Sequence, residues 1–199
     1  MAEEDPANLP EEFSRPQILF VMGLTAVLLL VVAKVWQHLA GVALFPLQVT
    51  GSAIAWGMAA AVAITLISQG AYYLWPGYRS SADRYLQLVL SPLVLTDLIW
   101  LGLLPGLSEE LLFRGVMLPS LGGNWLAVVA TSCVFGLLHL NGLQQWSYAV
   151  WAAIVGAILG AIALLTGNLL VPVVAHIGTN MLAGAIWKLG RWRSENAEG

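Results

Sequence analysis

The sequence predicts an all-α fold, a polytopic transmembrane helical bundle of about six spans with an amphipathic segment at the membrane interface. The first observation is composition, because 59% of the 199 residues are apolar and only 10% are charged. A soluble domain usually carries about 25% charged residues, and the mean hydropathy of this chain is +0.80. The second observation is that apolar runs recur along the chain, each close to the ~20 residues that a helix needs to cross a bilayer. Together they indicate an integral membrane protein.

Two apolar runs occupy the first part of the chain. The first covers residues 18–33 and extends to residue 39. It lacks the basic start and the small residues before a cut that a signal peptide has, so we expect an uncleaved span. The second covers residues 52–75 and ends at a Trp-Pro-Gly sequence. Residues 78–92 then mix charged and apolar side chains, which is typical of an amphipathic segment on the membrane surface.

More spans follow in the second half of the chain. Residues 93–119 form an apolar stretch of roughly 40 Å if helical, and Pro105 within it predicts one tilted or kinked span. The Leu-Gly-Gly-Asn sequence at 121–124 ends this stretch. The remaining apolar stretches cover residues 125–140, 146–165 and 169–189.

The spans also define the domain organisation and the orientation. We expect an acidic N-terminal tail at 1–17, two spans with the interfacial segment at 18–92, a membrane core at 93–189 and a C-terminal tail at 190–199. An even number of spans puts both termini on one side, and the side richer in Lys and Arg is cytoplasmic. Only Lys34 lies near the other side, so we expect a multi-pass protein of the cytoplasmic (inner) membrane with both termini cytoplasmic. The basic residues on the cytoplasmic side are Arg15, Arg79, Arg84, Lys188, Arg191 and Arg193.

The charge distribution excludes a class of partners. The formal net charge is −3, and the acidic residues concentrate in the two terminal segments. No basic face is available for nucleic acid, so the expected partners are the lipid bilayer and a substrate. The single cysteine, Cys133, rules out a disulfide within the chain.

Three polar residues interrupt the stretch 93–119. Glu110 and Arg114 are four residues apart, which places them on one helix face and predicts a charge-assisted pair. Glu109 points about 100° away from that face and is available for another task. Because a charge at the membrane centre costs ~2.5–3.5 kcal/mol even on the lenient insertion scale, each of these residues needs an explanation.

Two histidines occupy later spans at the same spacing. Phe135 and His139 are four residues apart, and so are His176 and Asn180. A single histidine in a membrane is as often a packing or hydrogen-bonding residue as a catalytic one. Taken together with the acidic group, however, they form the ordered motifs E-E-x-x-x-R, F-x-x-x-H and H-x-x-x-N, each on its own predicted span.

This ordered set resembles the motifs of the CAAX-prenyl endopeptidase and bacteriocin-immunity family of intramembrane proteases. All three motifs match, and the resemblance covers roughly residues 93–189, which leaves the first two spans outside it. It implies that residues 93–189 are a catalytic membrane core and that the chain is an endopeptidase. The substrate would be a membrane-associated or lipidated protein or peptide. A particular substrate does not carry over, because the family includes bacterial members with other roles.

The resemblance also implies a role for each matching residue. Glu109 would activate the attacking water, and His139 would help to hold that water. His176 and Asn180 would stabilise the oxyanion.

Glu110 and Arg114 match motif positions whose role is that of a structural ion pair. The chemistry of amide hydrolysis independently supports these assignments, because it needs a base for water, a proton donor for the leaving amine and fixed donors for the oxyanion. Glu109, a histidine and Asn180 can supply these groups.

Two alternatives stay open at this point. Glu109, His139 and His176 could bind zinc, but we favour a mechanism without a metal, because the H-E-x-x-H helix is absent and Asn180 is a poor zinc ligand. The other alternative is a non-enzymatic membrane protein, either a transporter, a proton carrier or a scaffold, that uses the same buried polar residues.

Helix geometry gives each predicted site residue a depth below the outer membrane surface. His176 lies about 12 Å deep, Asn180 about 18 Å and Glu109 about 15 Å, at 1.5 Å per residue. An ideal helix from the Gly-Gly-Asn break would place His139 about 22 Å deep, so it meets the others only if its span tilts or begins late. The polar stretch 141–145 then forms either the wall of a wet cavity or an ordinary surface loop.

One further acid, Asp97, precedes Glu109 in the same predicted span. We expect it to be hydrogen-bonded locally near the membrane surface. A group on a proton path is the alternative.

Overall fold

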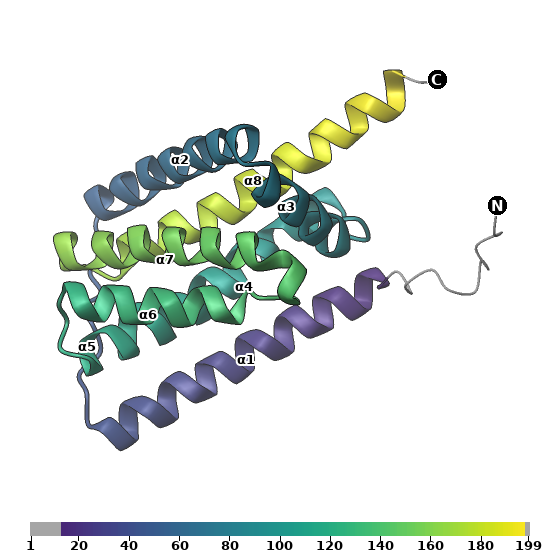
Figure 1. Cartoon of the computed structure of the whole chain (residues 1–199). Helices are drawn as coiled ribbons and strands as arrows, with labels where there is room; N and C mark the ends of the chain where they lie inside the picture. Colours follow the sequence, from purple (N-terminus) through teal and green to yellow (C-terminus); the bar gives the residue numbers. More distant parts are fainter. Residues whose placement is uncertain (1–12, 198–199) are drawn as a thin grey trace.

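The computed structural model describes residues 13–197, with side chains for residues 13–192. Every regular element in this part of the chain is helical, so the predicted all-α fold is confirmed (Figure 1). Of the predicted acidic tail at residues 1–17, residues 1–12 lie outside the described residues. The longer helices are α1 (Arg15–Ala40), α2 (Gly51–Leu74), α3 (Pro76–Leu90), α4 (Leu98–Glu110), α6 (Trp125–Leu138), α7 (Trp146–Thr166) and α8 (Leu170–Ala197). The shorter elements are the π-helix η3 (Leu111–Met117), α5 (Leu118–Ser120) and the 3-10 turns η2 (Leu95–Asp97) and η4 (Leu143–Gln145).

Among the described residues, four helical stretches are long and apolar enough to cross a membrane. A fifth arises if α3 and the stretch Leu95–Ser120, which are bent by 104°, count as one broken span. The chain is therefore a multi-pass membrane protein, and the prediction of about six spans agrees roughly with this count. The remaining apolar helix, α6, has 14 residues. It rises roughly 21 Å at 1.5 Å per residue, which is less than the ~30 Å of the hydrocarbon core.

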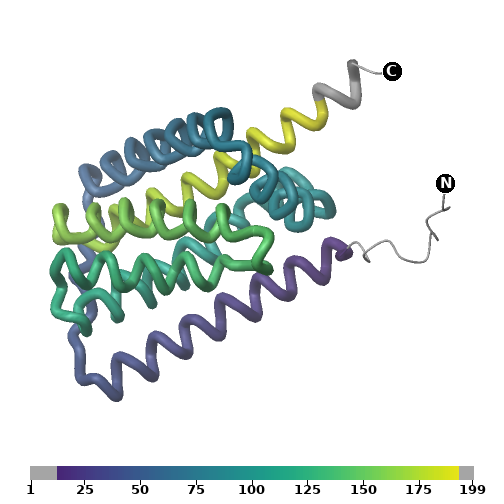
Figure 2. Tube along the Cα trace, viewed as in Figure 1, coloured from purple at the N-terminus to yellow at the C-terminus, as the bar shows by residue number. Residues whose placement is uncertain are grey.

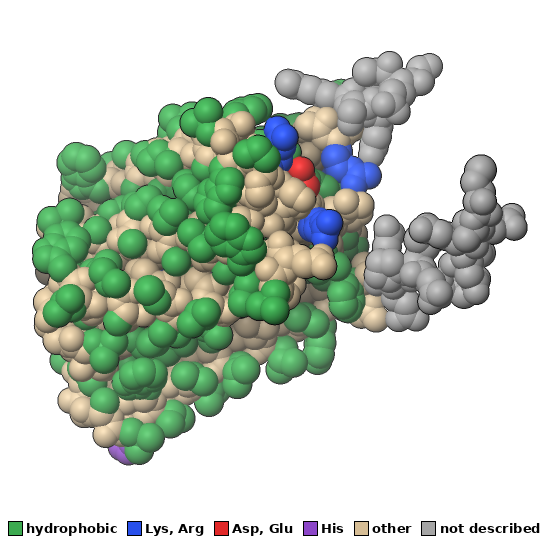
Figure 3. Space-filling view, viewed as in Figure 1, with side chains coloured by type: hydrophobic (Ala, Val, Ile, Leu, Met, Phe, Trp, Pro, Cys, Tyr) green, Lys and Arg blue, Asp and Glu red, His purple; other side chains and the backbone are tan. Residues whose placement is uncertain are grey.

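α3 lies at the end of the bundle where α1 begins and α8 ends (Figure 1). It starts at Pro76, whose fixed φ suits the first turn of a helix, and it contains most of the predicted amphipathic segment 78–92. Lys and Arg side chains gather at this end, whereas hydrophobic side chains cover the rest of the visible face (Figure 3). α8 continues helically to Ala197, beyond residue 189 where the predicted span ends and into the predicted C-terminal tail.

The consecutive helices α1 and α2 lie on opposite sides of the bundle and are joined by the segment 41–50 (Figure 2). α8 packs against α2 and α4, α6 packs against α7, and α1 packs against α4 and η3. Small residues allow this close packing, as the sequence predicts. A Cβ atom on Gly178 would lie 2.7 Å from Cβ of Ala61, and one on Gly184 would lie 2.7 Å from Cδ2 of Leu98.

The span that carries the two adjacent glutamates is irregular at η3. Here the helix changes to π-helical hydrogen bonding at Leu111, directly after Glu110. This change lies six residues beyond Pro105, where the sequence predicts a kink. The connecting segment 41–50 supports this irregular turn, because the N–H of Phe45 donates to the carbonyl oxygen of Gly115 at 3.0 Å. Single π-helical turns are rare and occur frequently at functional sites.

Candidate active site

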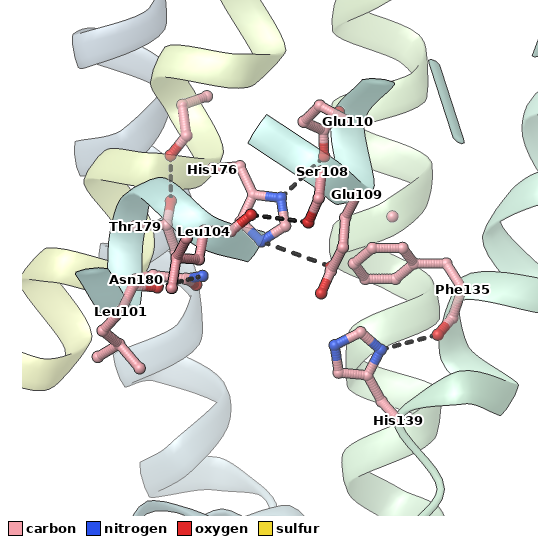
Figure 4. Close-up of polar contacts among 12 residues, drawn as sticks. Leu101, Leu104, Ser108, Glu109, Glu110, Phe135, His139, His176, Thr179 and Asn180 are labelled. Atoms are coloured by element: carbon pink, nitrogen blue, oxygen red, sulfur yellow. Dashed lines mark hydrogen bonds and ion pairs between the residues drawn. The ribbon is translucent and has the colours of Figure 1, made fainter. Parts of the chain in front are cut away.

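The predicted site residues line one cavity of about 300 Å³. Glu109 lies near the end of α4, His139 follows the last residue of α6, and His176 and Asn180 lie on α8. Figure 4 shows the Glu109 carboxylate between the rings of His176 and His139. The structure therefore brings together side chains from three separate helices.

His139 lines the cavity from the end of α6. The predicted span runs to residue 140, but the helix ends at Leu138 and His139 is its C-cap residue. The polar stretch 141–145 lines neither this cavity nor the adjoining one. Of the two alternatives for this stretch, the wet cavity wall is therefore wrong and the surface loop is right, because the stretch is largely exposed.

Glu110 is the centre of a buried polar cluster. Its Oε1 accepts a hydrogen bond from Nη1 of Arg114 at 2.7 Å and another from Nδ1 of His176 at 2.8 Å. Nη2 of Arg114 donates to the carbonyl oxygen of Gly156 at 2.6 Å. The side chains of Glu110 and Arg114 are 0% and 1% exposed. The predicted ion pair is thus present, but Glu110 also holds His176, a contact that no local spacing in the sequence signals.

Phe135 connects this ion pair to His139. The guanidinium carbon of Arg114 lies 4.9 Å from the centroid of the Phe135 ring, close enough for a cation–π interaction. The His139 ring lies 4.6 Å from the same ring, centroid to centroid. Packing on both neighbours gives Phe135 of the F-x-x-x-H motif a physical role, since it positions His139 relative to the charged pair.

Hydrogen bonds at Nδ1 fix the orientation of both histidines. Nδ1 of His139 lies 2.8 Å from the carbonyl oxygen of Phe135, and Nδ1 of His176 lies 2.8 Å from the Glu110 carboxylate. A carbonyl and a carboxylate only accept hydrogen bonds, so Nδ1 carries the proton in both rings. In the neutral form, each ring then presents the lone pair of Nε2.

Glu109 has a buried oxygen atom that lacks a protein partner. Its Oε2 lies 3.9 Å from Nε2 of His176, too far for a direct hydrogen bond but suited to one bridging water. No hydrogen bond from any described residue reaches this Oε2. Buried acceptors without partners are rare in folded proteins, and a water or ligand is a common reason for them.

A second cavity, of about 470 Å³, meets the first at His139, His176 and Asn180. It lies among α2, α3, α7 and α8 and extends to Asp83 and Arg191 at the basic end of the bundle. The candidate site therefore sits at the junction of two cavities, and Glu109 lines the smaller one.

Asp97 belongs to a separate polar cluster. Nε and Nη2 of Arg15 donate to its two carboxylate oxygens at 2.7 and 2.8 Å, and the N–H of Val94 donates at 2.9 Å. The bond to Val94 is the expected local one, whereas the pair with Arg15 joins α1 to the start of α4 and was not predicted. Asp97 lines neither cavity, so the geometry gives no support to a proton-path role.

The alternative zinc ligands predicted from the sequence are Glu109, His139 and His176. Within residues 13–192, no group of three or more His, Cys, Asp or Glu side chains is arranged to hold a metal ion. Nδ1 of each histidine is already hydrogen-bonded, which leaves only Nε2 as a ligand atom. Independence from a metal stays a prediction that needs a direct test.

Comparisons with known proteins agree with the three motifs. Residues 91–182 match the family model described as type II CAAX prenyl endopeptidase Rce1-like. The uncharacterized protein YpbD of Bacillus subtilis (strain 168) is 30% identical over 121 residues, which is 61% of this chain. The chain covers 61% of the length of that relative, and no solved structure matches. The segment that contains all three motifs is therefore similar to the type II CAAX prenyl endopeptidases, which confirms the resemblance that the motifs indicate.

Proposed function

We propose that this chain is an intramembrane endopeptidase of the CAAX-protease type in which Glu109 activates the water that cleaves the peptide bond. The observation that carries the proposal is the unpaired Oε2 of Glu109, buried and 3.9 Å from Nε2 of His176. One water fits between these two atoms. The similarity of residues 91–182 to prenyl endopeptidases supports the same reaction.

Glu109 would act first as a general base and then as a general acid. It takes a proton from the water while the water oxygen attacks the carbonyl carbon of the peptide. The lone pair on Nε2 of His139 accepts a hydrogen bond from the same water and holds it. The electron pair of the C=O bond moves onto oxygen and forms the oxyanion. When the C–N bond breaks, Glu109 returns its proton to the leaving nitrogen and the enzyme is regenerated.

Asn180 and His176 would donate hydrogen bonds to the oxyanion. Nδ2 of Asn180 makes one long bond, 3.4 Å to the carbonyl oxygen of Leu101, so one of its N–H groups remains available. His176 would donate from Nε2 when both ring nitrogens carry protons, and the Glu110 carboxylate at Nδ1 balances that charge. Glu110 would therefore act through His176 as a positioning residue, held in place by Arg114.

The walls of the smaller cavity favour a membrane-associated or lipidated peptide as the substrate. Apolar side chains of α1 and α3 form much of this wall. The apolar residues of this wall include Ile18, Val21, Met22, Leu86 and Val89.

The basic end of the bundle (Figure 3) supports a cytoplasmic location for both termini and insertion in the cytoplasmic membrane.

The proposal is tested by comparing protein N-termini in membranes from cells that carry either the wild-type chain or Glu109→Gln. We expect new N-termini that appear only with the wild type, because glutamine keeps the shape of the side chain but cannot take a proton. Asp97→Asn is the matched control, since it alters a buried carboxylate outside both cavities, and it should preserve the new N-termini. Identical N-termini in the wild type and Glu109→Gln would refute the proposal and favour the non-enzymatic carrier or scaffold.

A further inference from the structure

Two tyrosines line the smaller cavity together with Glu109: Tyr85 of α3 and Tyr148 of α7. Tyr148 also lines the second cavity, so it lies at the junction that contains the histidines. Its ring lies 6.4 Å from the ring of His139, centroid to centroid. Tyr148 is thus a neighbour of the candidate site, although it belongs to none of the three motifs.

The hydroxyl groups of Tyr85 and Tyr148 have no hydrogen-bond partner among the residues that the structure describes. Both side chains are half-buried. A tyrosine hydroxyl in such a position usually finds a partner, as Tyr72 does by donating to Oδ1 of Asp83 at 2.7 Å. The hydroxyl of Tyr148 is therefore available to a molecule in the cavity.

Packing fixes the ring of Tyr148 in place. It stacks on Tyr85 with centroids 4.6 Å apart and planes inclined by 27°. It also stacks on Tyr78, with centroids 6.4 Å apart and planes inclined by 14°. Tyr78 and Tyr85 are seven residues apart on α3, which places them on the same face two turns from one another.

The backbone that carries Tyr148 is also fixed, through its neighbour Ser147. The hydroxyl of Ser147 donates to the carbonyl oxygen of Gly77 at 2.8 Å and lies 2.9 Å from the hydroxyl of Ser81. These bonds tie the first turn of α7 to α3. Tyr148 therefore has the fixed position that a hydrogen-bond donor to a transition state requires.

The smaller cavity contains few hydrogen-bond donors for an oxyanion. Ser108 donates to the carbonyl oxygen of Leu104 at 2.7 Å, both Nδ1 atoms are hydrogen-bonded, and the Glu109 carboxylate only accepts. Nε2 of His176 already has a role at the oxyanion in the proposed function. The other polar groups of the wall are Asn180, the two tyrosine hydroxyls and Thr25 on the exposed helix α1. Among these, only Asn180 and Tyr148 line both cavities.

We propose that the hydroxyl of Tyr148 donates a hydrogen bond to the oxyanion of the tetrahedral intermediate, alongside Asn180 and His176. This inference rests on the proposed function. The phenol keeps its proton throughout, so the balance of the reaction does not change. The hydrogen bond strengthens when the C=O electron pair moves onto oxygen and weakens when the carbonyl reforms, so it stabilises the transition state more than the bound substrate.

The test is the steady-state kinetics of Tyr148→Phe, measured on a peptide that spans a cleavage site dependent on Glu109. Phenylalanine keeps the stacked ring and removes only the hydroxyl. Loss of one oxyanion donor lowers kcat by about 10²–10³-fold, and we expect KM to change little because the bond is weak in the ground state. The control is Thr166→Val, which removes an exposed hydroxyl at the other end of α7, outside both cavities, and should leave kcat unchanged.

A purely structural role for Tyr148 predicts a different pattern. In that case Tyr148→Phe would keep wild-type kcat, and only Tyr148→Leu, which removes the stacked ring, would lower activity together with thermal stability. Wild-type kcat in Tyr148→Phe overturns this inference and leaves the proposed function intact. If no cleavage site depends on Glu109, the proposed function fails and the role of Tyr148 fails with it.

Discussion

Each end of helix α4 has a cluster of charged side chains, and the two clusters differ in whether all their polar atoms have hydrogen-bond partners. At its start, Asp97 has all its hydrogen-bonding needs met, because Arg15 donates to both carboxylate oxygens and the N–H of Val94 donates as well. At its end, polar atoms remain without partners among the described residues. These atoms are Oε2 of Glu109, Oε2 of Glu110 and Nε of Arg114.

This difference separates a cluster that fastens helices from one that is suited to chemistry. A satisfied cluster holds α1 against α4 and has no remaining capacity for a ligand. An unsatisfied buried cluster is costly for a folded protein, and such groups need an explanation in water, a ligand or catalysis.

The largest expected effect is the loss of peptidase activity in Glu109→Gln. If the unpaired Oε2 is the base, glutamine removes proton transfer and lowers kcat by about 10²–10⁴-fold. The thermal unfolding temperature should remain close to that of the wild type, because this oxygen makes no hydrogen bond with the protein. Turnover near the wild-type rate in purified Glu109→Gln would show that the unpaired oxygen of Glu109 is not the base, and the difference between the two ends of α4 would then have no role in catalysis.

The next effect is a loss of folded protein in Arg114→Ala and Glu110→Ala. Each substitution leaves a buried charge without its partner, which costs roughly 3–5 kcal/mol. Unfolding in detergent, followed by circular dichroism, measures this loss. Arg114→Lys is the matched control, since it keeps the charge but not the second bond to Gly156, and its stability should be intermediate. If both alanine variants were as stable as the wild type yet inactive, the pair would belong to the chemistry instead.

The two ends of α4 also show what a sequence can and cannot predict. The Glu110–Arg114 pair was predictable, because a spacing of four residues fixes a helix face whatever the rest of the chain does. The apolar runs and the three motifs were predictable for the same local reason. The bond from Glu110 to His176 was not, because it joins residues 66 positions apart and depends on how α4 and α8 pack.

Two more features depended on long-range packing. The Arg15–Asp97 pair spans 82 positions, and neither residue has a local pattern that signals the other. The end of α6 at Leu138 had no proline to mark it, so the predicted span continued to residue 140, and the loop after it was left open between a cavity wall and a surface loop. In each case the missing information concerned contacts between helices, not the propensity of one segment.

A smaller effect is expected when the satisfied cluster is broken by Arg15→Ala. The Arg15 side chain is 50% exposed, so water replaces much of what the ion pair supplies, and salt screens the remainder. We expect a lower unfolding temperature than in the wild type, but a smaller decrease than for Arg114→Ala, and unchanged kcat. Lys34→Ala, which removes an exposed cation elsewhere on α1, controls for the loss of charge. A decrease in unfolding temperature as large as that of Arg114→Ala would show that the two clusters do not differ in the way that their hydrogen bonds indicate.

The smallest expected effect is that of metal removal. This experiment tests whether a water or a metal ion lies beside the unpaired oxygen of Glu109. A bridging water suits a 3.9 Å separation between Oε2 of Glu109 and Nε2 of His176. We expect purified protein to contain less than stoichiometric zinc and to keep its kcat after exhaustive chelation. Apo-protein prepared from Glu109→Gln serves as the baseline for residual activity. A loss of activity that zinc alone restores would replace the water with a metal and make Glu109, His139 and His176 candidate ligands. The unpaired oxygen at the end of α4 would then mark a coordination site instead of a base.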